Sequence, residues 1–235
     1  MFITFEGIEG CGKSTQAKRI ANRLERTGVS LILTREPGGT SIGHDIRQIL
    51  LSSKNRDLPP LAELFLYEAD RVLHMAGVVK PALAEKKWVL CDRFFDATTA
   101  YQGYARGQDL HMTTHLNEIA SFGITPDVTF LLDCPVSVGI KRALKRNAES
   151  EVVGQDRFEQ EKTVFHEAVR HGYMDLAKKN PERFVVVDAT QDEDRLEGAI
   201  FSHLKAHIPS SRRSIRHFGG VGRRGGKSRR PAGEI

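Results

Sequence analysis

Residues 7–14 of the chain, GIEGCGKS, combine three glycines, a lysine and a hydroxyl side chain at the spacing of a phosphate-binding loop. The backbone N–H groups of such a glycine-rich turn can surround a phosphate, and the N-terminus of the following helix adds its positive dipole. Lys13 then contacts the β- and γ-phosphates of a nucleotide, and the Ser14 hydroxyl ligates Mg²⁺. The sequence therefore predicts a nucleoside triphosphate site that consists of Gly7, Ile8, Glu9, Gly10, Cys11, Gly12, Lys13, Ser14 and Thr15.

The segments on either side of this loop are those that it requires. Residues 2–6 alternate like a buried strand, and the apolar residues of 17–24 recur at helical spacing. Four more short apolar runs follow, at 31–34, 88–92, 128–133 and 184–188. Between them the segments 60–84 and 159–178 have the pattern of long amphipathic helices. This alternation predicts a P-loop NTPase-type three-layer α/β/α fold with a five-stranded parallel sheet.

The bulk composition predicts one soluble domain followed by a basic tail. Of the 235 residues, 40% are hydrophobic and 28% are charged, and no apolar run is long enough to span a membrane. The three cysteines lie far apart without metal-binding or disulfide spacing, which favours reduced thiols in the cytoplasm. Residues 209–235 carry a net charge of +7, whereas 1–208 carry −2. We therefore expect a folded domain over 1–208 and a disordered Arg/Gly-rich tail over 209–235.

Further motifs follow the phosphate-binding loop in a fixed order. TREPGGT at 34–40 follows the second strand and places Arg35 at the carboxyl edge of the sheet, where ligands bind in open α/β folds. ADR at 69–71, DRF at 92–94 and AYQG at 100–103 come next. Together with the phosphate-binding loop, this set resembles the thymidylate kinase family, and the resemblance covers residues 1 to about 205. It implies an enzyme that transfers the γ-phosphate of ATP to dTMP and is commonly a homodimer.

The resemblance also implies roles for individual residues. Arg93 matches the arginine that grips the dTMP phosphate, a task suited to a planar, permanently charged guanidinium, and Arg35 would assist it. Glu9 matches an acidic position near the acceptor sugar, and Asp92 would act beside Mg²⁺. The residues that would surround the base and sugar are Tyr67, which would stack on thymine, Arg71 and Thr98 at the base edge, Tyr101 against C2′ of the sugar, and Gln102 beside it.

The phosphate-binding loop contains no arginine, so the resemblance places the catalytic cation in a helical lid over about 141–161. DRFE at 156–159 resembles the family's D-R-x-E motif, and Arg146 precedes it. The predicted catalytic residues are therefore Lys13, Arg93, Arg146 and Arg157. A basic helix face without a catalytic role is the competing interpretation of the lid arginines.

The residues and their spacing leave further interpretations open. Tyr67 could simply pack its helix, and Arg71 could form a surface ion pair with a neighbouring carboxylate. The acceptor could be another nucleoside monophosphate, such as dUMP. A regulatory GTPase is disfavoured because the chain lacks an N-K-x-D signature. The tail could bind nucleic acid through its eight cations, or it could be an appendage without a function.

Overall fold

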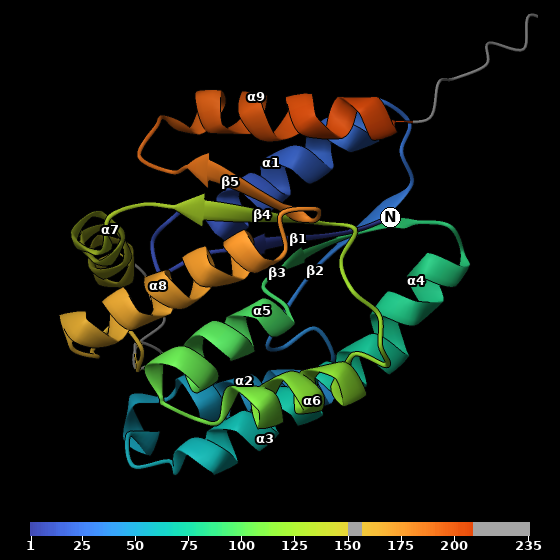
Figure 1. The fold of residues 1–235 in the computed structure, drawn as a ribbon. Coiled ribbons are helices and arrows are strands. Elements are labelled where there is room, and N and C mark those ends of the chain that lie inside the picture. The colour runs from blue at the N-terminus through green and yellow to red at the C-terminus, as the bar shows by residue number, and fades with distance from the viewer. Residues whose placement is uncertain (150–156, 209–235) are drawn as a thin grey trace, which may run out of the picture.

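A five-stranded sheet forms the centre of the computed structural model, which describes residues 1–149 and 157–208 (Figure 1). Its strand order is β2-β3-β1-β4-β5, and every neighbouring pair is parallel. The strands are β1 (Phe2–Glu6), β2 (Leu31–Arg35), β3 (Trp88–Asp92), β4 (Val128–Asp133) and β5 (Phe184–Asp188). The predicted five-stranded parallel sheet is confirmed, and β2 alone is longer than predicted, by one residue.

Helices cover both faces of this sheet (Figure 1). Helices α1 and α9 pack against each other on one face, whereas α4 and α8 contact the strands from the other. The α-helices of the described residues are α1 (Lys13–Arg26), α2 (Ser41–Leu51), α3 (Pro60–His74), α4 (Lys80–Ala84), α5 (Phe95–Thr98), α6 (Leu110–Ala120), α7 (Val136–Ala148), α8 (Thr163–Lys179) and α9 (Glu193–Leu204). None of them is both long enough and apolar enough to cross a membrane. The three-layer α/β/α architecture is confirmed.

The segment predicted as one helix over 60–84 is interrupted. A π-helical stretch, Met75–Val79, separates α3 from α4, and a second one, Thr99–Ala105, follows α5. Such stretches are frequent at functional sites, and the second one carries Tyr101 and Gln102. The predicted tail at 209–235 and the middle of the predicted lid, 150–156, lie outside the described residues.

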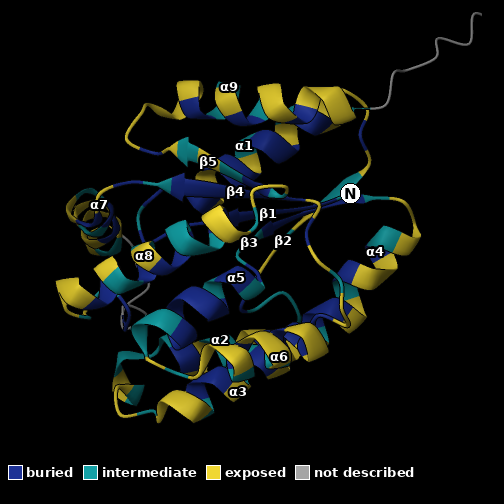
Figure 2. Ribbon diagram, viewed as in Figure 1, coloured by how far each residue is buried: buried dark blue, intermediate teal, exposed yellow. Residues whose placement is uncertain are grey.

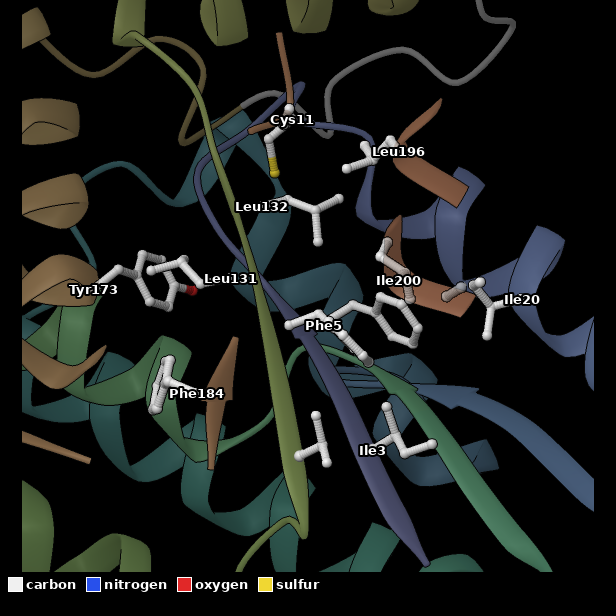
Figure 3. Packing of buried hydrophobic residues seen from close by; sticks show 14 of the residues in the cluster. Ile3, Phe5, Cys11, Ile20, Leu131, Leu132, Tyr173, Phe184, Leu196 and Ile200 are labelled. Atoms are coloured by element: carbon white, nitrogen blue, oxygen red, sulfur yellow. The ribbon is translucent and has the colours of Figure 1, made fainter. Parts of the chain in front are cut away.

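The core follows from the two-residue period of the strands. Ile3 and Phe5 of β1 point toward α1 and α9, where they lie near Ile20 and Ile200 (Figure 3). Tyr173 of α8 lies on the opposite face of the same sheet (Figure 3). Because the central strands are buried on both faces, they hold the loops at their carboxyl ends in place (Figure 2).

Candidate active site

A cavity of about 700 Å³ opens at the carboxyl edge of the sheet, where β1, β2 and β3 end. The sequence motifs meet here because the carboxyl ends of parallel strands lie at one edge of a sheet. The predicted residues that line the cavity are Glu9, Gly10, Lys13, Ser14, Arg35, Tyr67, Arg71, Asp92, Arg93, Thr98, Tyr101, Gln102 and Arg146. Arg157 is not among the lining residues.

The phosphate-binding loop connects β1 to α1 and is built around glycines. Gly10 has a φ of 71°, and a Cβ added to it would lie 1.9 Å from the carbonyl oxygen of Gly139 on α7, so no side chain fits there. The Lys13 side chain folds back over the loop, and its Nζ donates to the Ile8 carbonyl oxygen at 2.7 Å. The loop therefore combines the backbone conformation and the buried cation that a phosphate cradle requires.

A second cavity, of about 520 Å³, lies on the other side of this loop. Thr15 and Cys11 line it, together with Arg142 of α7 and residues that connect β5 to α9. Gly10 and Arg146 line both cavities. No sequence motif marks the β5–α9 connection, so sequence reasoning missed this part of the site. The loop thus separates two compartments, and Arg146 reaches both.

Ser14 and Asp92 bring two oxygen ligands together beside the phosphate-binding loop. The Ser14 hydroxyl, in the first turn of α1, donates to the Asp92 carboxylate at the end of β3. Within 1–149 and 157–208, no group of three or more His, Cys, Asp and Glu side chains could hold a metal ion. An all-oxygen pair next to a phosphate site fits Mg²⁺, which retains water and phosphate ligands besides one or two protein oxygens.

Arg93 lines the first cavity and has a left-handed backbone conformation, with φ at 72°. Its Nη1 donates to the Gly7 carbonyl oxygen and the Tyr173 hydroxyl, both at 3.1 Å. Its Nη2 donates to Glu9 Oε1 at 3.1 Å and to the Tyr101 hydroxyl at 3.0 Å. Burial alone would lower the pKa of Arg93, but the oxygens of Tyr101, Tyr173 and Glu9 raise it well above its ordinary value. Arg93 is therefore a fixed, permanent cation.

Arg35 at the end of β2 and Arg47 on α2 line the same cavity as Arg93. Arg47 Nη1 donates to the Pro37 carbonyl oxygen at 3.0 Å. Burial, together with the positive charge of Arg35, lowers the pKa of Arg47. Three cations around one space form an anion site, because a phosphate among them relieves their repulsion. Arg47 was missed, since only its place on the helix after the TREPGGT motif could have indicated it.

Arg71 of α3 is a buried arginine that also lines the cavity. Its Nε donates to Glu36 Oε2 at 3.0 Å, and its Nη1 donates to Glu68 Oε2 at 2.7 Å and Asn117 Oδ1 at 2.9 Å. Its Nη2 donates to the Thr98 hydroxyl at 2.8 Å. Burial would lower the pKa of Arg71, but the two carboxylates raise it above its ordinary value. The surface ion pair considered for Arg71 is wrong, since the pair with Glu68 exists but is buried.

The two lid arginines occupy different places. Arg157, buried behind the cavity, forms an ion pair with Glu63 of α3, and its Nη1 donates to the Leu50 carbonyl oxygen at 3.0 Å. Glu63 Oε1 also accepts from Gln102 Nε2 at 2.8 Å. Arg146 of α7 is exposed and lies in the cavity lining. Of the two arginines, only Arg146 lines a cavity, and it lines both.

Glu9 of the phosphate-binding loop is a buried carboxylate. Its Oε1 accepts from the Tyr101 hydroxyl as well as from Arg93. Burial raises the pKa of Glu9, but the ring of His166 and the charges of Arg93 and Lys13 lower it to about 2. Glu9 is therefore ionised at neutral pH and can accept a hydrogen bond from a ligand hydroxyl.

Glu6, the last residue of β1, contacts two neighbours of Arg93. Its Oε1 accepts from the Phe94 N–H and its Oε2 from the Tyr173 hydroxyl, both at 2.7 Å. Burial and the charge of Asp96 raise the pKa of Glu6 to about 8. Sequence reasoning assigned Glu6 only to a strand, because its role depends on α8 and on the residue after Arg93.

Comparisons with known proteins agree with this geometry. The family model described as thymidylate kinase matches residues 5–200. The thymidylate kinase of Desulfosudis oleivorans is 51% identical over 206 residues, which cover 87% of this chain and 96% of that protein. That of Syntrophotalea carbinolica is 55% identical over 194 residues, 82% of this chain and 90% of that protein. The crystal structure of thymidylate kinase from Ehrlichia chaffeensis superposes with a TM-score of 0.69 at 37% identity, covering 87% of this chain and 98% of that one.

Proposed function

The chain belongs to the thymidylate kinase family, and from this premise we propose that it transfers the γ-phosphate of ATP to dTMP, giving dTDP, in the larger cavity. One observation carries the proposal. A single cavity is lined by Lys13 and Ser14 of the phosphate-binding loop, by Arg71 of α3, and by Arg35, Arg47 and Arg93. A nucleotide acceptor placed there has its phosphate among cations and faces the donor loop.

The donor nucleotide would occupy the phosphate-binding loop. The loop's N–H groups and Lys13 bind its phosphates, and the second cavity accommodates the nucleoside. Ser14 and Asp92 would hold Mg²⁺, which when bound neutralises charge on the phosphate oxygens. Thr15, which lines the second cavity, contributes to the donor side.

The acceptor would lie in the first cavity. Arg35, Arg47 and Arg93 bind the dTMP phosphate, and Glu9 accepts a hydrogen bond from the sugar hydroxyl. The aromatic ring of Tyr67 stacks on the base. The remaining contacts to base and sugar come from Arg71, Thr98, Tyr101 and Gln102.

Phosphoryl transfer demands positioning and charge neutralisation more than covalent chemistry. The acceptor phosphate is already anionic, so no strong general base is required. Lys13 and Arg146 neutralise the charge that spreads over the transferred group. Arg157 pairs with Glu63, so in this conformation it ties the last part of the lid to α3 and α2.

An ATP-dependent assay of the full chain against dTMP, dUMP, UMP, dCMP and AMP tests the activity. We expect turnover with dTMP and a lower kcat/KM for every other acceptor. Failure on dTMP with turnover of any other acceptor would overturn the proposal. The variant Arg71→Gln is expected to prefer dTMP less strongly than the parent chain does, because it lacks the guanidinium that would contact the base.

We also propose that the enzyme is a cytoplasmic homodimer. Three unpaired cysteines, all buried, are consistent with a reducing compartment. Helices α3 and α6 contact each other, and they carry the exposed apolar residues Leu61, Phe65 and Ile119. Exposed apolar side chains on neighbouring helices favour a protein interface. Sedimentation of the chain and of its Phe65→Glu variant tests this, and a monomeric parent chain at micromolar concentration contradicts it.

A further inference from the structure

His166 is a buried histidine whose ring nitrogens have no hydrogen-bond partner in the part of the chain that the structure describes. It is the fourth residue of α8 and is 1% exposed. Buried polar atoms without a partner are rare in folded proteins, so each one calls for an explanation. Its ring lowers the pKa of Glu9, but none of the roles proposed above has it bind a substrate.

The nearest anionic atom to His166 belongs to the phosphate-binding loop. Its Nδ1 lies 3.4 Å from Glu9 Oε2, and Oε2 is likewise buried without a hydrogen-bond partner among the described residues. The second oxygen of the carboxylate, Oε1, already accepts from Tyr101 and Arg93. His166 Nδ1 and Glu9 Oε2 are thus close enough for a hydrogen bond but lack its geometry. A small rotation of either side chain would form this hydrogen bond.

Aromatic rings enclose this pair. Tyr101 packs edge-on against Phe158 and Phe165, with ring centroids 5.5 and 6.1 Å apart. The Phe165 ring also packs edge-on against His166 at 5.6 Å. Apolar surroundings strengthen a hydrogen bond between an N–H group and a carboxylate, because no water competes for either partner.

We propose that His166 is a positioning residue for Glu9: its imidazole N–H holds Oε2, so that the carboxylate stays oriented toward the 3′-hydroxyl of the acceptor nucleotide. This rests on the proposed function, in which Glu9 binds the acceptor sugar. His166 does not touch the acceptor. It acts through Glu9 and thereby sets the preference for acceptors that carry a 3′-hydroxyl.

The test compares two acceptors in one variant, His166→Phe, which keeps a ring and removes the N–H. We expect kcat/KM for dTMP to fall roughly tenfold, mainly through KM, because a hydrogen bond to a charged group is weakened. With 3′-deoxythymidine monophosphate, which lacks the hydroxyl, kcat/KM should stay as in the parent chain. The preference for dTMP over the 3′-deoxy acceptor then falls by the same factor, whereas KM for ATP is unchanged.

His166→Asn is the second variant, because its amide N–H takes the place of Nδ1. It should recover part of the lost preference. His171→Phe is the matched control on the same helix, since His171 is exposed and packs against Tyr104. It should behave as the parent chain.

Equal losses with both acceptors in His166→Phe and His166→Asn would mean that His166 only supports the fold, and the inference would be wrong. An unchanged acceptor preference in His166→Phe would overturn it as well. If the parent chain itself fails to phosphorylate dTMP, the proposed function is wrong and the inference falls with it. That result differs from the first two, in which the parent chain is active.

Discussion

Alanine substitutions at the two lid arginines should have opposite effects on stability and on turnover. Arg157 is 3% exposed and pairs with Glu63, which is 0% exposed. Arg146 is 61% exposed and donates to Glu159 Oε1 at 3.1 Å. We expect Arg157→Ala to destabilise the fold, and Arg146→Ala to lower kcat while the stability stays nearly constant.

The magnitudes follow from the burial of each pair. Removing one partner of a buried ion pair costs about 3–5 kcal/mol, because the remaining charge stays buried and uncompensated. Glu63 keeps hydrogen bonds from Gln102 Nε2 at 2.8 Å and Arg106 Nε at 3.3 Å, so the lower end applies to Arg157→Ala. At roughly 2–4 °C per kcal/mol for a domain of this size, the Tm falls by about 6–12 °C. The exposed Arg146 pair contributes about 0–1 kcal/mol, so Arg146→Ala shifts the Tm by less than about 4 °C.

Turnover is expected to fall more in Arg146→Ala, the variant whose Tm changes less. Loss of a cation that stabilises the transferred group lowers kcat by at least about tenfold in Arg146→Ala, while KM for ATP changes little. Lys145→Ala is the matched control, because Lys145 is exposed on the same helix and does not line either cavity. The assay couples ADP formation to NADH oxidation, and thermal unfolding of each variant is followed by circular dichroism.

A double-mutant cycle tests the buried pair directly. Glu63→Gln should lower the Tm on its own, and combining it with Arg157→Ala should cost less than the sum of the single losses, since both remove the same interaction. The importance of the buried pair is refuted if Arg157→Ala has the same Tm as the parent chain. It is also refuted if the Tm losses of the two single variants add up in the double variant. A tenfold loss of kcat in Arg157→Ala without any loss of Tm would show that Arg157 is a catalytic residue, as its motif indicates.

Three further outcomes are expected. Because the folded chain raises the pKa of Glu6 from 4.5 to about 8, the folded state keeps a proton that the unfolded state loses; stability therefore decreases by a few kcal/mol as pH rises from about 5 to 8. Urea denaturation of Glu6→Gln at several pH values should lack this decrease, and an equal slope in both chains contradicts it. Gly139→Ala should raise KM for ATP at least about tenfold, because its Cβ would lie 2.5 Å from the Glu9 carbonyl oxygen and push α7 off the phosphate-binding loop; an unchanged KM refutes that contact. Chelation of divalent ions should abolish activity and added Mg²⁺ restore it, with Asp92→Asn and Ser14→Ala requiring more Mg²⁺ in a titration; activity without any divalent ion would exclude the proposed metal site.

The sequence by itself determined the five strands and the part of the site that the motifs carry. Strand bounds followed from short apolar runs, because a strand covered on both faces must be hydrophobic along its length. The motifs at 7–14, 34–40 and 92–94 each follow a strand, and parallel topology brings such positions to one edge. Arg35, Arg93 and Glu9 could therefore be assigned to one cavity before any distance was known.

Only the tertiary structure decided which side chains meet across the chain. Glu63 and Arg157 are 94 residues apart in sequence, and their burial together moved Arg157 away from the cavity that its motif predicts. Arg47 and His166 belong to no motif, yet helix packing places Arg47 beside Arg35 and His166 beside Glu9. Spacing along a chain encodes which face of an element a residue occupies, whereas contact between elements depends on how those faces pack, which no local pattern carries.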